Sequence, residues 1–180
     1  MNGPAFVADF FVLGAAKRIM SISSGFRALM SVRNFTCAAA LLRLQIDTAA
    51  RLNALRYVES VDDLCRSLMT GTRFDRHRDR NGKPLKDGYL ISKLSEIAPW
   101  VAEVYRETSG FVHLSDRHIF STMSDAKDET RSVKLTISAN DPERPDHQYL
   151  EIIDAFAEAT ILAGSLVEKY ADARSAVKEG

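Results

Sequence analysis

An arginine and a histidine lie seven positions apart in the segment Arg106-Glu-Thr-Ser-Gly-Phe-Val-His113. If one helix continues through this segment, seven residues make just under two turns, so both side chains leave the same side, with backbones about 10 Å apart. Imidazole exchanges a proton near neutral pH, and a guanidinium stabilises the charge that grows on a phosphoryl group. The pair therefore suits metal-independent cleavage of RNA, whose own 2′-hydroxyl supplies the nucleophile.

The same residues also have a structural interpretation. Arg106 would then form an ion pair on the surface or between helices, and His113 would be a partly buried histidine with a satisfied hydrogen bond. Asp47, with Arg43 one turn before it, is the candidate partner across the bundle, because its carboxylate could orient His113 or hold Arg106. Alternatively, Asp47 pairs only with Arg43 at i, i+4. His118 is either a second proton carrier or a loop residue.

The spacing of apolar residues predicts the elements that position these groups. Steps of three and four residues, typical of helices with one buried face, recur over about 5–31, 34–55, 61–69, 89–106 and from 146 onward. Pro99 predicts a kink or a helix restart in the fourth segment. Apolar residues around a polar stretch predict a hairpin at about 118–138. The fold class is therefore mainly α: a single domain over 1–180, a four-helix up-and-down bundle with one short extra helix and a small β-hairpin excursion before the last helix.

Composition limits the class of protein. The chain has 180 residues, 46% hydrophobic and 27% charged, which is the balance of one soluble domain. Its 24 basic and 24 acidic residues cancel, so attraction to nucleic acid or membrane would have to come from a local patch. The longest apolar run of the N-terminal region, Phe10 to Ala16, is about a third of the roughly 20 residues that a membrane span needs. We expect a cytoplasmic protein with no membrane partner.

Metal and cofactor chemistry is not indicated by the motifs. The chain has no glycine-rich phosphate loop, no Gly-x-Ser-x-Gly and no His-Glu-x-x-His, and its four histidines are scattered. Cys37 and Cys65 both lie in apolar helical patterns, which predicts buried thiols and no disulfide or zinc site. We expect neither a metal nor a cofactor.

Residues 72–88 contain Asn81-Gly82, Pro84 and Gly88 without an apolar period, which predicts a long exposed loop. Its stretch from Arg73 to Lys86 carries six basic residues against two aspartates, an excess of four positive charges. The basic residues are Arg73, Arg76, Arg78, Arg80, Lys83 and Lys86. With Phe74 and Tyr89 at its edges for stacking, this loop either grips a nucleic-acid backbone or is simply solvated.

The segment around the Arg/His pair resembles a family. Arg-x(4–6)-His near the end of a core helix is the pattern of the HEPN superfamily, and Arg106 to His113 fits it with six intervening residues. The wider stretch, which includes Tyr105 and Ser109, is similar to uncharacterised bacterial helical proteins related to that superfamily, as is Arg33-Asn34-Phe35 with the residues up to Asp47. The resemblance covers about 5–118 and the last helix.

The resemblance implies a homodimer whose two Arg/His sets meet in one cleft, and in active members a metal-independent endoribonuclease, often a toxin restrained by an antitoxin or an anti-phage effector. Arg106 would stabilise the phosphoryl charge and His113 would act as general acid or base. The chain departs from the pattern at Glu107, where active members often have Asn, Asp or His. The alternative is a catalytically inactive module that recognises a nucleotide, an RNA or a protein partner through the same cleft.

A dimer also has support in the first helix. Phe6, Phe10, Phe11 and Leu13 crowd its start with more apolar surface than one buried face needs. Such an excess is typical of a seam between two chains, which would also fit a mainly structural role.

Overall fold

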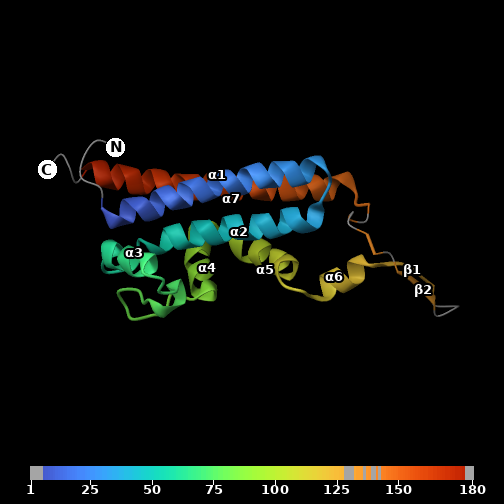
Figure 1. Ribbon diagram of the computed structural model, residues 1–180, viewed down its shortest axis with the longest axis horizontal. Coiled ribbons are helices and arrows are strands. Elements are labelled where there is room, and N and C mark those ends of the chain that lie inside the picture. The colour runs from blue at the N-terminus through green and yellow to red at the C-terminus, as the bar shows by residue number, and fades with distance from the viewer. Residues whose placement is uncertain (1–5, 128–131, 136, 139–140, 142, 177–180) are drawn as a thin grey trace.

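The computed structural model describes residues 6–127, 132–135, 137–138, 141 and 143–176 (Figure 1). In this part of the chain most residues are helical, and three long helices lie side by side along the length of the molecule. They are α1 (Val7–Ser31), α2 (Phe35–Ala54) and α7 (Asp146–Ala176), and each packs against the other two. The prediction of a mainly helical bundle is confirmed.

A tight turn joins α1 to α2. Arg33 has φ +54°, in the left-handed region that usually ends a helix with glycine. The Asn34 N–H donates to the Leu29 carbonyl at 2.9 Å, and the Arg33 N–H donates to the Met30 carbonyl at 3.1 Å. The Asn34 side chain then accepts from the Cys37 N–H at 3.0 Å and caps α2. These bonds reverse the chain within three residues, so α1 and α2 run antiparallel, as expected for an up-and-down bundle.

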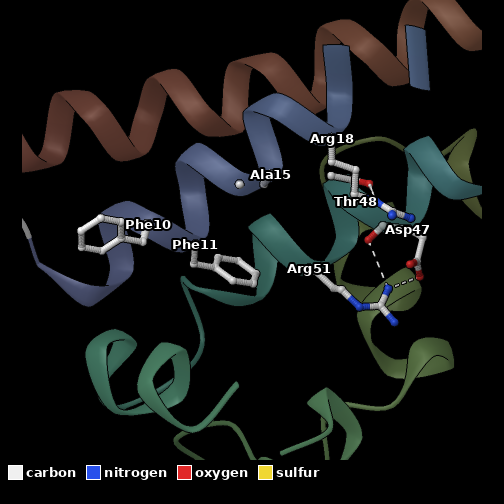
Figure 2. A pocket seen from close by; sticks show the side chains of 8 residues that line it. Phe10, Phe11, Ala15, Arg18, Asp47, Thr48 and Arg51 are labelled. Carbon is white, nitrogen blue, oxygen red and sulfur yellow. Dashed lines mark hydrogen bonds and ion pairs between the residues drawn. The ribbon is translucent and has the colours of Figure 1, made fainter. Parts of the chain in front are cut away.

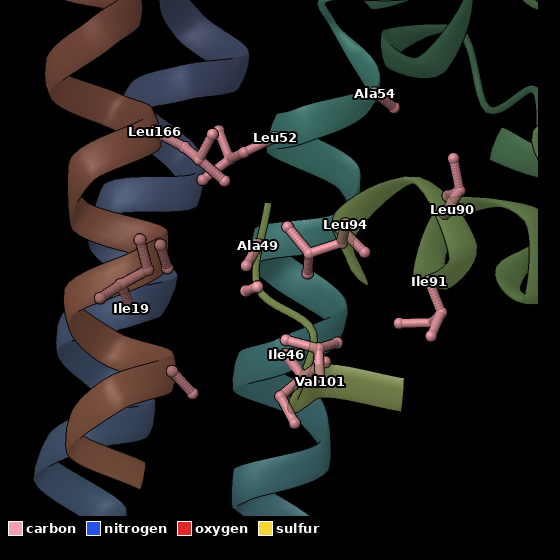
Figure 3. Packing of buried hydrophobic residues seen from close by; sticks show 14 of the residues in the cluster. Ile19, Ile46, Ala49, Leu52, Ala54, Leu90, Ile91, Leu94, Val101 and Leu166 are labelled. Atoms are coloured by element: carbon pink, nitrogen blue, oxygen red, sulfur yellow. The ribbon is translucent and has the colours of Figure 1, made fainter. Parts of the chain in front are cut away.

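The core lies between the long helices. Figure 3 shows Leu52 of α2 and Leu166 of α7 pointing toward each other, and both are buried. The rings of Phe26 and Phe156 stack with centroids 3.8 Å apart and link α1 to α7. Because α2 also packs against α4 (Asp87–Ser95) and α5 (Val101–Val112), it lies in the middle of the bundle.

The fourth predicted long helix is two shorter ones. Helix α4 ends at Ser95 and α5 begins at Val101, so the restart near Pro99 is confirmed. Proline has no N–H and crowds the preceding turn, which explains the break. The second helix continues six residues beyond the predicted end at Arg106, to Val112. The chain therefore has two short helices where one long helix was expected.

A buried carboxylate ties the start of α1 to the end of α7. Asp9 accepts hydrogen bonds from the Phe6 N–H at 2.9 Å, the Tyr170 hydroxyl at 2.8 Å and Arg174 Nε at 3.2 Å. The Phe6 N–H, together with Tyr170 and Arg174, holds the pKa of Asp9 below its usual value despite burial. The ionised carboxylate is therefore part of the folded structure.

The two cysteines differ in their surroundings. Cys65 is fully buried, as predicted. It lies on α3 (Val61–Met69), which has the predicted bounds and is capped by the Ser60 hydroxyl, which accepts from the Asp63 N–H. Cys37 is exposed, so the prediction that it is buried is wrong. It lies in the first turn of α2, on the side that faces solvent.

The predicted loop 72–88 is folded rather than exposed throughout. It contains the short 3₁₀ helix η1 (Phe74–Arg76) and a fully buried Leu85. The Asp79 carboxylate is buried and accepts from the N–H groups of Asn81 and Lys83 and from the Tyr89 hydroxyl, at 2.9, 2.7 and 2.6 Å. The Tyr89 hydroxyl and these backbone donors hold the pKa of Asp79 below its usual value. One aspartate thus organises the loop, a role that the charge count did not indicate.

The hairpin before the last helix exists, but its first strand is not where it was predicted. Ile119 and Phe120 lie in the short helix α6 (Asp116–Ser121), and the strands are β1 (Met123–Lys127) and β2 (Ser132–Leu135). The strands pair antiparallel. Figure 1 shows α6 and the hairpin extending away from the three long helices.

Parts of two predicted elements lie outside the residues that the structure describes. The predicted first helix begins at about Ala5, and the predicted hairpin at about 118–138 includes 128–131 and 136. Ala5, residues 128–131 and residue 136 all lie outside the described part. Within the described ranges, no helix combines the length and the apolar character that crossing a membrane requires.

Candidate functional site

The Arg/His pair lies on the surface at the end of α5. The Arg106 side chain is 72% exposed, with ion-pair distances of 3.8 Å to Glu103 and 3.6 Å to Glu107. His113 is exposed and caps the end of α5 with an extended backbone. The expected continuous helix through His113 therefore stops one residue short of it. Among the described residues no hydrogen bond or ion pair joins Arg106 to His113.

Two residues near the pair have local structural roles. The Ser109 hydroxyl donates to the Tyr105 carbonyl at 2.7 Å within α5. His118 Nδ1 accepts from the Ser115 N–H at 3.3 Å and closes a capping box at the start of α6. Because Nδ1 accepts, the neutral His118 ring carries its proton on Nε2. His118 therefore lies in a helix and not in a loop.

Asp47 does not reach the Arg/His pair. Its carboxylate forms an ion pair with Arg51, one turn later on α2, and lies 3.9 Å from Arg43. The prediction that Asp47 orients His113 or holds Arg106 is therefore wrong for the single chain. The i, i+4 spacing of Asp47 and Arg51 on α2 is a sequence signal for the pair that forms.

Arg43 and Tyr105, both predicted as supporting residues, do meet. The Arg43 guanidinium carbon lies 3.1 Å from the centre of the Tyr105 ring, which joins α2 to α5 by a cation–π contact. Burial lowers the pKa of Arg43, and burial raises the pKa of Tyr105. Arg43 Nε is buried without a hydrogen-bond partner among the described residues. This contact stabilises the position of α5, the helix that carries the Arg/His pair.

Arg51 is a polar centre that the sequence analysis missed. It pairs with Asp47 and, at 3.2 Å, with Asp87 at the start of α4. Burial favours a lower pKa for Arg51, but the hydrogen bond to Asp47 and the charges of Asp47 and Asp87 outweigh it, and the pKa is raised. Arg51 is therefore a fixed positive charge between α2 and α4.

A cleft opens beside this centre, between α1 and α2 (Figure 2). Its volume is about 470 Å³. Its lining consists of apolar residues of α1 and charged or polar residues of both helices: Phe10, Phe11, Gly14, Ala15, Arg18, Asp47, Thr48 and Arg51. Of these, the sequence analysis proposed only Asp47 as a functional residue, because the others become neighbours only when α1 and α2 pack.

Three of the basic residues of loop 72–88 hold the loop together. Arg73 forms two hydrogen bonds to the Asp75 carboxylate, at 3.1 and 2.7 Å. Arg78 donates to the Gly82 carbonyl at 2.6 Å. Arg80 donates to main-chain carbonyls after α2, including that of Arg56 at 2.9 Å. Their guanidinium groups act within the fold, which favours the structural interpretation of the charge excess.

The remaining basic residues of the loop face different surroundings. Lys83 Nζ lies 5.0 Å from the Tyr89 ring, Lys86 immediately precedes α4, and Arg76 ends η1. Both aromatic edge residues are half-buried and have contacts within the fold. Phe74 packs against Phe11 of α1 with centroids 6.4 Å apart, and the Tyr89 hydroxyl binds Asp79. These contacts favour the structural interpretation of the two rings, and base stacking on them stays a prediction.

The described residues contain no group of three His, Cys, Asp or Glu side chains placed to hold a metal ion. In the loop region, His77 Nε2 lies 3.3 Å from the Ser67 hydroxyl oxygen of α3, within hydrogen-bonding distance. It links two elements of the fold.

No family model, no curated protein and no solved structure matches this chain. The resemblance to the HEPN superfamily therefore depends on the sequence motifs alone and stays a prediction.

Proposed function

We propose that the protein is a metal-independent, HEPN-like endoribonuclease that acts as a homodimer through Arg106 and His113. The observation that carries the proposal is the exposure of both residues, Arg106 in the second half of α5 and His113 directly after its end, where a substrate can reach them. The resemblance implies a four-helix arrangement. In this account three of those helices are α1, α2 and α7, and the shorter helices α4 and α5 together take the place of the fourth.

The reaction needs only groups that the RNA and the pair supply. The 2′-oxygen attacks the adjacent phosphorus while the bond from phosphorus to the 5′-oxygen breaks. His113 takes the 2′-hydroxyl proton or gives a proton to the leaving 5′-oxygen, and the His113 of a second copy can serve the other step. Arg106 stabilises the extra negative charge on the phosphoryl oxygens. The products are a 2′,3′-cyclic phosphate and a 5′-hydroxyl.

Exposed apolar residues next to the pair support a dimer. Val112, Leu114, Ile119 and Phe120, at the end of α5 and in α6, are 43%, 91%, 56% and 65% exposed. A second copy that covers them would remove apolar surface from water and bring two Arg/His sets together. Phe10 and Leu13 of α1 are also exposed, but this proposal places the dimer contact at α5 and α6.

A second candidate, the inactive binding module, is favoured by the surroundings of Arg106. Glu103 and Glu107 both lie within ion-pairing distance of its guanidinium, and their charges oppose an incoming phosphate. If the enzyme is active, Glu107→Gln should raise the cleavage rate, because it removes one of these charges. If the protein only binds RNA or an antitoxin-like partner, Glu107→Gln should change affinity without producing cleavage.

The test incubates the purified protein with total RNA in the presence of EDTA. We expect cleavage by the wild type and loss of cleavage in Arg106→Ala and in His113→Ala. The matched controls are Arg27→Ala, an exposed arginine of α1, and His77→Ala, a histidine of loop 72–88 whose contact is with Ser67 of α3. Cleavage that survives both active-site changes contradicts the assignment. RNA binding by the wild type without cleavage supports the binding module.

The dimer is tested by light scattering of the same preparations. The wild type should have the mass of two chains, and Phe120→Asp should shift it toward one chain and lower cleavage. A wild type that is monomeric at micromolar concentration contradicts a composite site.

A further inference from the structure

The cleft between α1 and α2 has one apolar end and one charged end. Figure 2 shows the rings of Phe10 and Phe11 toward one side and Arg18, Asp47 and Arg51 toward the other. Neither Arg106 nor His113 lines it. Its volume of about 470 Å³ falls within the range of roughly 300–1,000 Å³ that small-ligand pockets occupy.

The charged end carries an unbalanced arginine. Arg51 is neutralised by Asp47 and Asp87. Among the described residues, the Arg18 guanidinium forms one hydrogen bond, from its Nε to the Thr48 hydroxyl at 3.0 Å. No carboxylate of the described residues forms an ion pair with Arg18. Of the two arginines in the lining, Arg51 is therefore paired with carboxylates and Arg18, within the described part of the chain, is not.

The Arg18 side chain is held in place by Thr48 of α2. Thr48 is buried, and its hydroxyl donates to the Leu44 carbonyl at 2.8 Å, so its oxygen is oriented to accept from Arg18 Nε. A guanidinium held through Nε keeps its two terminal amino groups for a second partner. Such a fork matches the two oxygens of a carboxylate or a phosphate.

The apolar end is kept open by a glycine. Gly14 lies inside α1, where glycine costs about 1 kcal/mol relative to alanine. A Cβ atom at this position would meet no heavy atom within 4 Å, so close helix packing does not require the glycine. Its effect is to leave space beside Phe10, a residue that is 58% exposed. A flat ring can lie against that aromatic surface.

We propose that this cleft binds a small anionic ligand with a flat ring, the anion at Arg18 and the ring beside Phe10 and Gly14. A nucleoside monophosphate and an aromatic carboxylate share this chemistry. The proposal does not depend on the ribonuclease activity, since its residues are separate from the Arg/His pair.

Binding is measured by calorimetry with three probes: adenosine monophosphate, indole-3-carboxylate and inorganic phosphate. We expect one of the first two to bind, and phosphate alone to bind at least about tenfold more weakly, because it lacks the ring. The stronger of the two ring compounds identifies the source of the anion. Equal affinity for inorganic phosphate overturns the role of the apolar end, and no binding of any probe at millimolar concentration overturns the proposal.

Two variants locate the ligand. Gly14→Leu fills the apolar end, and Arg18→Gln removes the charge while keeping a side chain that can reach Thr48, so each should raise the Kd about tenfold or more. The controls are Gly164→Leu, at a helical glycine that also has open space around it, and Lys17→Gln, which removes a neighbouring exposed charge. Circular dichroism checks that each variant folds. Unchanged affinity in folded Arg18→Gln contradicts the proposed site, even if Gly14→Leu does not fold.

Discussion

A buried hydrogen bond joins α2 to α7, and we expect the loss of one partner to destabilise the protein more than the loss of the other. Gln45 has no exposed surface, and its Nε2 donates to Thr160 Oγ1 at 3.0 Å. Thr160 in turn donates to the Phe156 carbonyl at 2.8 Å. Gln45 Oε1 is buried without a partner among the described residues. Loss of Gln45 therefore leaves Thr160 bonded, whereas loss of the Thr160 hydroxyl leaves the Gln45 amide with no side-chain partner that the structure shows.

The magnitudes follow from this asymmetry. Thr160→Val keeps the side-chain shape and should lower the free energy of unfolding by about 1–3 kcal/mol, the cost of a buried unpaired polar group. Gln45→Leu replaces the amide by an apolar group of similar size and should stay within about 1 kcal/mol of the wild type. The double variant should resemble Gln45→Leu, which gives a coupling energy of about 1–3 kcal/mol between the two sites.

The assay is urea unfolding followed by far-ultraviolet circular dichroism. The midpoint should change while the slope with urea stays constant, because the surface exposed on unfolding is nearly unchanged. The reasoning is refuted if Gln45→Leu is more destabilising than Thr160→Val, or if the effects of the two changes simply add.

Three further predictions concern single groups. Asp9→Asn should lower the free energy of unfolding at neutral pH and have less effect below about pH 4, because a carboxyl whose folded-state pKa lies below its unfolded value loses its contribution as the pH falls through the folded-state pKa; an equal effect at pH 7 and pH 3, measured by urea unfolding, contradicts this. Burial, followed by the charge of a nearby aspartate, raises the pKa of Cys65 to about 11, so at pH 8 a maleimide should label Cys37 rapidly and Cys65 slowly, and two fast thiols in mass spectrometry would be inconsistent with the fold. Arg80→Ala should lower the melting temperature because Arg80 holds main-chain carbonyls, whereas Arg76→Ala should leave it nearly unchanged; equal melting temperatures would show that the loop does not need this anchor.

The periodic segments could be predicted from the sequence because helix formation depends on local spacing. The bounds of α2 and α3 and the break at Pro99 follow from apolar steps, caps and a missing N–H donor. The strand predicted at Ile119 and Phe120 is wrong because two apolar residues in sequence fit a helix as well as a strand.

The long-range polar contacts could not be predicted in the same way. Arg43 and Tyr105 are far apart in the chain and meet only because α5 packs across α2. Asp47 has an arginine one turn away on each side, Arg43 and Arg51. The sequence alone does not show whether its carboxylate pairs with one of these or with the distant Arg106. The cleft at Arg18 likewise exists only after α1 and α2 have packed.

The basic loop shows how a charge count can mislead. The excess of positive charge suggested a surface for nucleic acid, but Arg73, Arg78 and Arg80 all have partners inside the protein. A guanidinium has five donors and often serves main-chain carbonyls as readily as phosphates. The number of arginines in a loop therefore does not determine how many face a ligand.

The central claim is that the 2′-hydroxyl of RNA is the nucleophile and that Arg106 and His113 act on its phosphodiester. The most direct measurement compares two oligonucleotides in EDTA, an RNA cut by the wild-type protein and the same RNA with a 2′-deoxynucleotide at the cut position. The account predicts that the first is cleaved to a 2′,3′-cyclic phosphate and a 5′-hydroxyl, and that the second is not cleaved there. Cleavage of both at the same position would contradict it.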